Sequence, residues 1–279
     1  MTKIHVATDQ HYIDSMERML KQFGFNKSYH FLGDITPHYE TKDDETNLKA
    51  RVNEIKEKYP RASGNQVYDH MITDDIGRAL EDYEKIPRNT ARRIGFIEEN
   101  KSNSVVSISG NTDLIFHGML ETLSDVTGIG TPTNLDLLRG TKAIKFQYKE
   151  PLHWGWDEST NIYEIPFSED EFSTKRLADL FSSSVHRYRN HLILTHENPH
   201  PEGVGIKREV KMQKTLDSFI DTIRDANKNS NIALACGHLH VSGDPYEYRG
   251  ITIVPIAPDE VMKYDTKKGD FKVVKADNM

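Results

Sequence analysis

Five short apolar runs divide the chain, and each is followed by a polar residue able to bind a metal ion. The runs occupy residues 4–8, 29–32, 105–109, 191–195 and 232–235. Short apolar stretches that stop at glycine or at a polar residue indicate buried strands. Because sites in open α/β sheets form at the carboxyl ends of strands, the residues after these runs are expected at one edge of the fold.

Residues with helical spacing lie between these runs. In residues 14–23, Met16, Met19, Leu20 and Phe23 recur at intervals of three and four, which predicts an amphipathic helix. A strand, a helix and a second strand in this order form a βαβ unit with parallel strands. Further helices are predicted at 114–123, 172–188 and 210–223, and further strands at 143–148, 161–166, 251–256, 260–264 and 271–274.

The stretch between residues 40 and 100 is longer than one crossover connection needs. It is charged, and its apolar residues form helical stripes in 48–59 and 68–83, while Asn89 is the predicted N-cap of a third helix. In the simpler interpretation, these helices pack on the sheet as scaffold. In the alternative, they form a cap beside the site that selects the substrate. We predict one domain, residues 1–279, with a helical insertion at about 40–100.

A tryptophan pair, Trp154-Gly155-Trp156, lies between two of the predicted strands. Packing in the core is the simpler interpretation. Stacking on a nucleic-acid base is the alternative, because aromatic faces serve that purpose in single-strand binding proteins.

Composition narrows the class of protein. Lys and Arg number 36 and Asp and Glu 43, so the net charge of −7 gives no overall basic footprint for nucleic acid or anionic membrane. The single cysteine, Cys236, excludes an intrachain disulfide and fits a reducing compartment. No signal-peptide segment precedes the first strand, and no apolar run approaches the roughly 20 residues of a membrane span. We expect a soluble, cytoplasmic protein without a membrane partner.

The clearest chemical signal is Gly237-His238-Leu239-His240, after the last of the five runs. In extended backbone this spacing places both imidazoles on one side, and imidazole is the commonest metal ligand. Two ordinary histidines at a strand end would look the same, so the motif alone is weak. Comparable groups follow the other four runs: Asp9 with His11, Gly33-Asp34, Gly110-Asn111, and His196.

In this order, Asp-x-His, Gly-Asp, Gly-Asn, a lone His and Gly-His-x-His resemble the motifs of the calcineurin-like metallophosphoesterase superfamily. The resemblance spans Asp9 to His240. It implies a four-layer α/β/β/α sandwich of two mixed β-sheets flanked by helices. It also implies two metal sites, the first held by Asp9, His11, Asp34 and His240, the second by Asp34, Asn111, His196 and His238.

The implied cofactor is a dinuclear centre of two divalent ions bridged by Asp34. Manganese is our first choice, and Fe, Zn, Co and Ni are alternatives, because mixed nitrogen and oxygen ligands do not select among these metals. The resemblance implies that a hydroxide between the metals attacks phosphorus in line. Asp34 and Asn111 are therefore catalytic candidates as well as ligands.

Thr112 departs from the pattern of the superfamily, in which many members have a histidine after Gly-Asn. That histidine helps to protonate the leaving group, and a threonine hydroxyl is no useful acid near pH 7. In this respect the chain resembles the small phosphodiesterases of the superfamily, which have a residue other than histidine at this position. His38 and His117 are candidates for the missing acid, with ordinary surface histidines as the alternative, and Asp113 is expected to structure the loop.

The predicted function is a metal-dependent phosphodiesterase acting on a small molecule or a nucleic acid. Its first alternative is a nuclease resembling the DNA-repair members of the superfamily. A phosphomonoesterase ranks lower because of Thr112. A non-catalytic scaffold ranks last, because no ligand position has been lost. The oligomeric state stays open, with a homodimer as one option.

Overall fold

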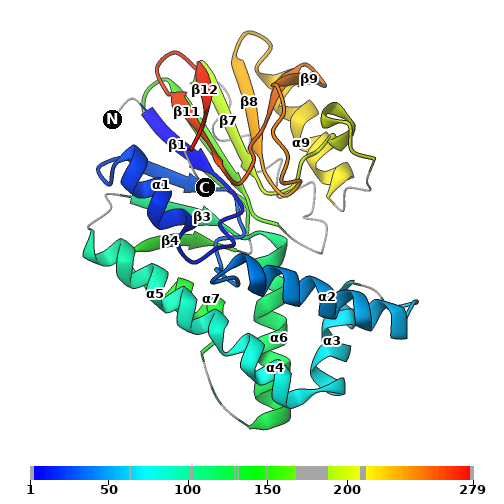
Figure 1. Cartoon of the computed structure of the whole chain (residues 1–279). Coiled ribbons are helices and arrows are strands. Elements are labelled where there is room, and N and C mark those ends of the chain that lie inside the picture. Colours follow the sequence, from blue (N-terminus) through cyan, green and yellow to red (C-terminus); the bar gives the residue numbers. More distant parts are fainter. Residues whose placement is uncertain are drawn as a thin grey trace.

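Two six-stranded sheets lie face to face, with helices on their outer faces (Figure 1). The computed structural model describes residues 3–62, 64–100, 104–128, 130, 132–148, 150–167, 188–207 and 212–276. Both sheets are mixed, and the predicted α/β/β/α sandwich is confirmed. The predicted helix at 172–188 lies almost wholly outside the described residues.

The first sheet has the strand order β12-β11-β1-β2-β3-β4. Its four parallel strands are β1 (Lys3–Ala7), β2 (Ser28–Phe31), β3 (Ser104–Ile108) and β4 (Ile144–Gln147). Two antiparallel strands extend it beyond β1: β11 (Glu260–Asp265) and β12 (Phe271–Lys275). The carboxyl ends of β1, β2 and β3 therefore meet at one edge of this sheet.

The second sheet has the order β5-β6-β7-β8-β10-β9. Its four parallel strands are β6 (Thr160–Ile165), β7 (Asn190–Thr195), β8 (Asn231–Cys236) and β10 (Ile251–Pro255). Antiparallel strands close both of its ends: β5 (Leu152–Gly155) and β9 (Tyr246–Tyr248). The ends of β7 and β8 lie side by side, which brings their following loops together.

Side chains alternate between the two faces of each strand and so build separate cores. In β1, Ile4 and Val6 pack between the sheets with Leu192 and Leu194 of β7. Ala7 points to the opposite face and joins the core under the outer helices. Because both faces of β1 are buried, the first sheet needs a packed layer on each side.

Helices cover both outer faces. On the first sheet these are α1 (Ser15–Phe23), α5 (Lys85–Glu99) and α7 (Asn134–Gly140), and α9 (Gln213–Ala226) covers the second. The apolar stripe of α1, which includes Met16, Met19 and Leu20, is buried in the core of that layer, as the spacing predicts.

Part of the insertion forms a core of its own, away from the sheets (Figure 1). It contains α2 (Lys42–Lys58), α3 (Gly64–Asp74), α4 (Ile76–Tyr83) and the long helix α6 (Asn111–Thr127). Met71 and Ile72 of α3 pack there with Phe116 and Leu120 of α6. The α6 helix thus starts at the sheet edge and packs against the insertion through its middle turns, from Phe116 to Leu123.

Three local predictions were wrong. The stripe at 68–83 is two helices, because the Asp75 side chain accepts from the backbone N–H of Arg78 and starts α4 anew. Asn89 lies inside α5 and not at its start, because a proline such as Pro87 is tolerated in a first helical turn. Trp154, predicted between strands, belongs to β5 and packs in the core between the sheets. The short helix α7 was not predicted.

Within the described ranges, no helix is both long and apolar enough to cross a membrane.

Candidate metal centre

Five loops converge at the edge where the two sheets meet. They follow β1, β2, β3, β7 and β8, and they carry all the acidic, amide and imidazole groups that the sequence motifs single out. Asp9, Asp34 and His196 are buried, with 2%, 1% and 0% of their surfaces exposed. Imidazoles and carboxylates are rarely buried together unless they are paired or bind a cation.

Two glycines allow the loops after β2 and β3 to approach each other. Gly33 has φ +104°, and a Cβ there would lie 2.5 Å from the backbone nitrogen of Gly110. A Cβ on Gly110 would lie 2.1 Å from Oδ1 of Asp34. Both distances are below any real Cβ contact, so the Gly-Asp and Gly-Asn motifs need glycine for packing as much as they need the polar residue.

Exchanging Gly110 for alanine is expected to destabilise the protein by about 1–3 kcal/mol, because the new Cβ would displace the Asp34 carboxylate. Gly118→Ala, in the helix that Gly110 precedes, is the matched control, because its Cβ would meet nothing within 4 Å. That change is expected to stabilise by about 0.5–1 kcal/mol, since alanine favours a helix. Urea unfolding measures both; effects of the same sign would contradict the close approach.

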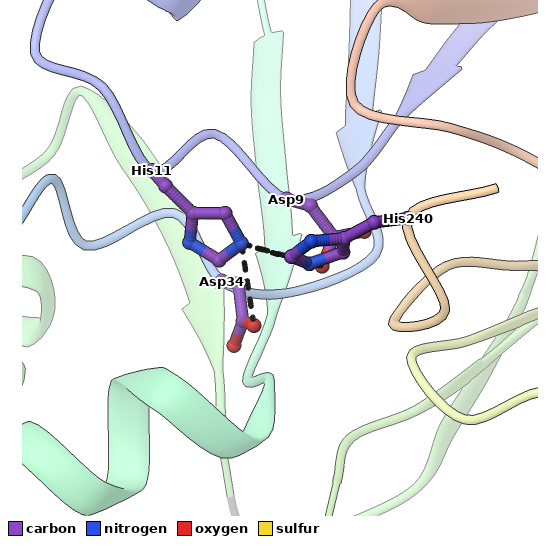
Figure 2. A group of neighbouring side chains, drawn as sticks. All are labelled: Asp9, His11, Asp34 and His240. Carbon is purple, nitrogen blue, oxygen red and sulfur yellow. Dashed lines mark hydrogen bonds and ion pairs between the residues drawn. The ribbon is translucent and has the colours of Figure 1, made fainter. Parts of the chain in front are cut away.

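The first candidate group consists of Asp9, His11, Asp34 and His240 (Figure 2). One ligand atom of each lies within 4.8 Å of those of the others. Nε2 of His11 is 3.0 Å from Nε2 of His240 and 4.0 Å from Oδ2 of Asp34. Nε2 of His240 is 3.1 Å from Oδ1 of Asp9. The donor atoms therefore face a common point, as a coordination sphere requires.

The second candidate group consists of Asp34, His196 and His238. Nε2 of His196 lies 3.0 Å from Nδ1 of His238 and 3.5 Å from Oδ2 of Asp34. The amide oxygen of Asn111 is 2.8 Å from the same Nε2. Asp34 belongs to both groups, so its carboxylate lies between two clusters of nitrogen and oxygen donors. These His and Asp groups are able to bind divalent metal ions.

Hydrogen bonds behind these residues orient them. Nδ1 of His196 lies 2.8 Å from the carbonyl oxygen of Leu32, so Nδ1 donates its proton there and Nε2 keeps its lone pair for a cation. The backbone N–H of His238 and the hydroxyl of Thr8 both donate to Oδ2 of Asp9. The unprotonated nitrogen of His196 is what a metal ligand needs.

Backbone conformation sets four of the candidates apart. Among the described residues, five that are not glycine have positive φ, and four of them are Asp9, Asp34, His238 and His240, with φ between 51° and 68°. This left-handed region is sparsely populated by residues with a Cβ and costs of order 1–3 kcal/mol each. The fold therefore maintains strain at the positions that aim ligand atoms at the centre.

A buried arginine ties two of the ligand loops together. Arg93 of α5 is 3% exposed, and its guanidinium donates to the backbone carbonyls of Gln10, at 2.7 Å, and Ile35. It also donates to the carbonyl of Tyr12, at 2.5 Å. Gln10 and Tyr12 flank His11 in the chain, and Ile35 follows Asp34. A single side chain thus fixes the distance between the β1 and β2 loops.

The electrostatics of the centre favour a bound cation. Burial raises the pKa of Asp34 to about 6, with the charge of Asp9 acting in the same direction. Burial also lowers the pKa of His11 well below its usual value, so its imidazole is neutral. Burial acts to lower the pKa of His196, but Asp34 and Asp9 outweigh it and raise that pKa. A metal ligand must be deprotonated, so a cation bound here would displace the protons that these groups hold.

Thr112 lies directly on the shared carboxylate. Its backbone N–H donates to Oδ1 of Asp34 and its hydroxyl donates to Oδ2, each at 2.8 Å. Asp113, buried next to it, accepts from the backbone N–H groups of Gly110 and Thr36. Both residues hold the loop in place, which agrees with the structural role predicted for Asp113.

The two histidines predicted as acids lie in different surroundings. The ring of His38 is 4.8 Å from that of His11 and 4.7 Å from that of Phe116, next to the first group. Burial lowers its pKa to about 3. His117 lies one helical turn beyond the loop, with Nδ1 3.0 Å from the hydroxyl of Thr133 and Nε2 3.5 Å from Glu121. None of its contacts with described residues involves the centre.

Arg93 and Thr8 were missed at the sequence level. Arg93 is one of several charged residues in a charged helix, and nothing local marks it as buried. Thr8 directly precedes Asp9, but its contact with that carboxylate depends on the loop conformation.

No family profile and no curated protein sequence matches the chain. Among solved structures, the chain resembles one described as a "putative 5′-nucleotidase" from Staphylococcus aureus in complex with α-ketoglutarate, with 9% identity and a TM-score of 0.42. The match covers 98% of this chain and 52% of that one, so this chain spans about half the length of the solved chain. At this similarity, function has to be inferred from the residues of the centre itself.

Proposed function

We propose that this protein is a metal-dependent phosphodiesterase. The observation that carries the proposal is the pair of donor clusters that share Asp34. Two-metal sites with a shared ligand are common in enzymes that transfer or hydrolyse phosphoryl groups.

In this proposal, Asp9, His11, Asp34 and His240 hold one divalent cation, and Asp34, Asn111, His196 and His238 hold the other. Their mixture of oxygen and nitrogen atoms suits Mn, our first choice, and equally Fe, Zn, Co or Ni. The bound cations would supply Lewis-acid chemistry, which activates water at neutral pH and offsets charge on the phosphoryl oxygens.

The residues of the chain perform the remaining tasks. The Asp34 carboxylate would hold both cations, and Thr112 fixes the rotation of that carboxylate through its two hydrogen bonds. Because the Thr112 hydroxyl already donates to Asp34, it offers no proton to a leaving group. This supports a phosphodiester substrate with a good leaving group over a phosphomonoester with a poor one.

The proposal predicts turnover of bis(p-nitrophenyl) phosphate in preference to p-nitrophenyl phosphate when Mn²⁺ is supplied. Chelation is expected to abolish the activity, and added Mn²⁺ to restore it, because the donor clusters act only through the cations. Release of p-nitrophenol measures both reactions. A preference for the monoester would contradict the diesterase assignment. Activity that survives chelation would contradict the metal dependence.

A further inference from the structure

A cavity of about 240 Å³ lies between the metal centre and the helical insertion. His38 from the loop after β2 lines it together with Asn47 of α2, Arg78 of α4 and Phe116 of α6. The cavity is therefore made largely by helices that the two-sheet fold does not need.

The cavity adjoins the candidate ligands. His38 forms part of its wall, and the His38 ring is 4.8 Å from the ring of His11, which is not part of the lining. Phe116 and Tyr83 form an apolar part of the lining, and they are 2% and 1% exposed. A molecule with a phosphorus atom at the centre could thus extend past His38 into a preformed space.

One positive charge in this lining, that of Arg78, has no acidic partner among the described side chains. Lys85 lies 3.7 Å from Asp44, and Asp44 also accepts hydrogen bonds from Thr41 at the start of α2. Neither the guanidinium of Arg78 nor the amide of Asn47 has a partner among the residues that the structure describes. The nearby Arg88, in contrast, pairs with Glu40 at 3.2 Å.

We propose that this cavity recognises a second phosphate group on the substrate, beyond the phosphodiester at the metal centre, through Arg78 and Asn47. A guanidinium matches phosphate geometry with two parallel hydrogen bonds, and a terminal phosphate is the group that an uncompensated arginine favours. The amide N–H of Asn47 adds a neutral donor. The inference rests on the proposed function, and it specifies the substrate class as a phosphodiester with a further phosphate.

The test uses the Mn²⁺-loaded full chain and a thymidine dinucleotide that cannot be cleaved, because a methylene group replaces its leaving oxygen. Calorimetric titration compares this probe with and without a 5′-terminal phosphate. We expect the terminal phosphate to strengthen binding about tenfold, as a charged hydrogen-bonded contact would. The gain should vanish in Arg78→Gln and persist in the control Arg61→Gln, an exposed arginine outside this lining.

A gain that persists in Arg78→Gln would overturn the proposal, and so would the absence of any gain in the wild-type protein. Hydrolysis of bis(p-nitrophenyl) phosphate in the same wild-type preparation separates the two proposals. An Arg78-dependent gain without hydrolysis would count against the phosphodiesterase and support the phosphate-binding cavity. Hydrolysis without a gain would count against the cavity alone.

Discussion

Replacing Asp34 with alanine is expected to lower phosphodiester turnover by about 10³-fold or more, because the carboxylate serves both donor clusters. No neighbouring side chain can take its place, since each other candidate belongs to one cluster. The number of Mn²⁺ ions per chain, measured by elemental analysis after gel filtration, is expected to fall as well. Asp34→Asn keeps the shape of the side chain and separates the loss of charge from the loss of packing.

The folded structure should survive this change. Burial raises the pKa of Asp34, so without a cation the charged carboxylate destabilises the fold rather than stabilising it. The unfolding midpoint of chelated Asp34→Ala should therefore stay close to that of the chelated wild type. Asp225→Ala, at an exposed residue paired with Arg224, is the control for both measurements. Wild-type turnover in Asp34→Ala would remove Asp34 from the proposed centre.

Replacing Arg93 with methionine is expected to weaken Mn²⁺ binding about 10–100-fold, as the loss of a residue behind metal ligands does. Its guanidinium holds three backbone carbonyls, and their loops carry His11 and Asp34. Without it, the buried carbonyls of Gln10 and Ile35 lose this donor at a cost of about 1–3 kcal/mol each, so the unfolding midpoint should fall too. The Mn²⁺ concentration that gives half-maximal turnover, measured well below that midpoint, reports the effect on the centre.

A purely structural role for Arg93 would lower stability and leave that Mn²⁺ concentration unchanged, which would contradict a positioning role. Excess Mn²⁺ should restore much of the turnover, because Arg93 does not touch the ligand atoms. Arg93→Lys should recover only part of the affinity, since one ammonium cannot reproduce the planar fork. Arg92→Met tests the neighbouring arginine, which is exposed, and is expected to change neither quantity.

The sequence revealed the central strands and the polar residues after them because both signals are local. A run such as residues 232–235 is apolar without interruption, and Gly237 and two histidines follow within five positions. Parallel strands then bring such ends to a common edge, whatever the loops between them do. The fold class and the convergence of the five loops were therefore predictable.

The remaining features depend on contacts between distant residues. Arg93 looks like any other arginine of a charged helix until α5 packs against the β1 and β2 loops. The break between α3 and α4 depends on one capping hydrogen bond at Asp75, and the spacing of apolar residues gives no sign of that bond. The short strand β5 is only Leu152-His153-Trp154-Gly155, and four residues are too few to show a period of two.

The position of β1 in the first sheet has a consequence for the synthesis of the chain. β1 lies between β2 and β11, and residues 3–6 pair with residues 262–265. On the ribosome, the loop with Asp9 and His11 is therefore made more than 250 residues before the strand that pairs with β1. Closing so long a segment is slow. β1 thus exposes an unpaired edge until β11 has been made, and a chaperone that shields such edges would help this protein to fold.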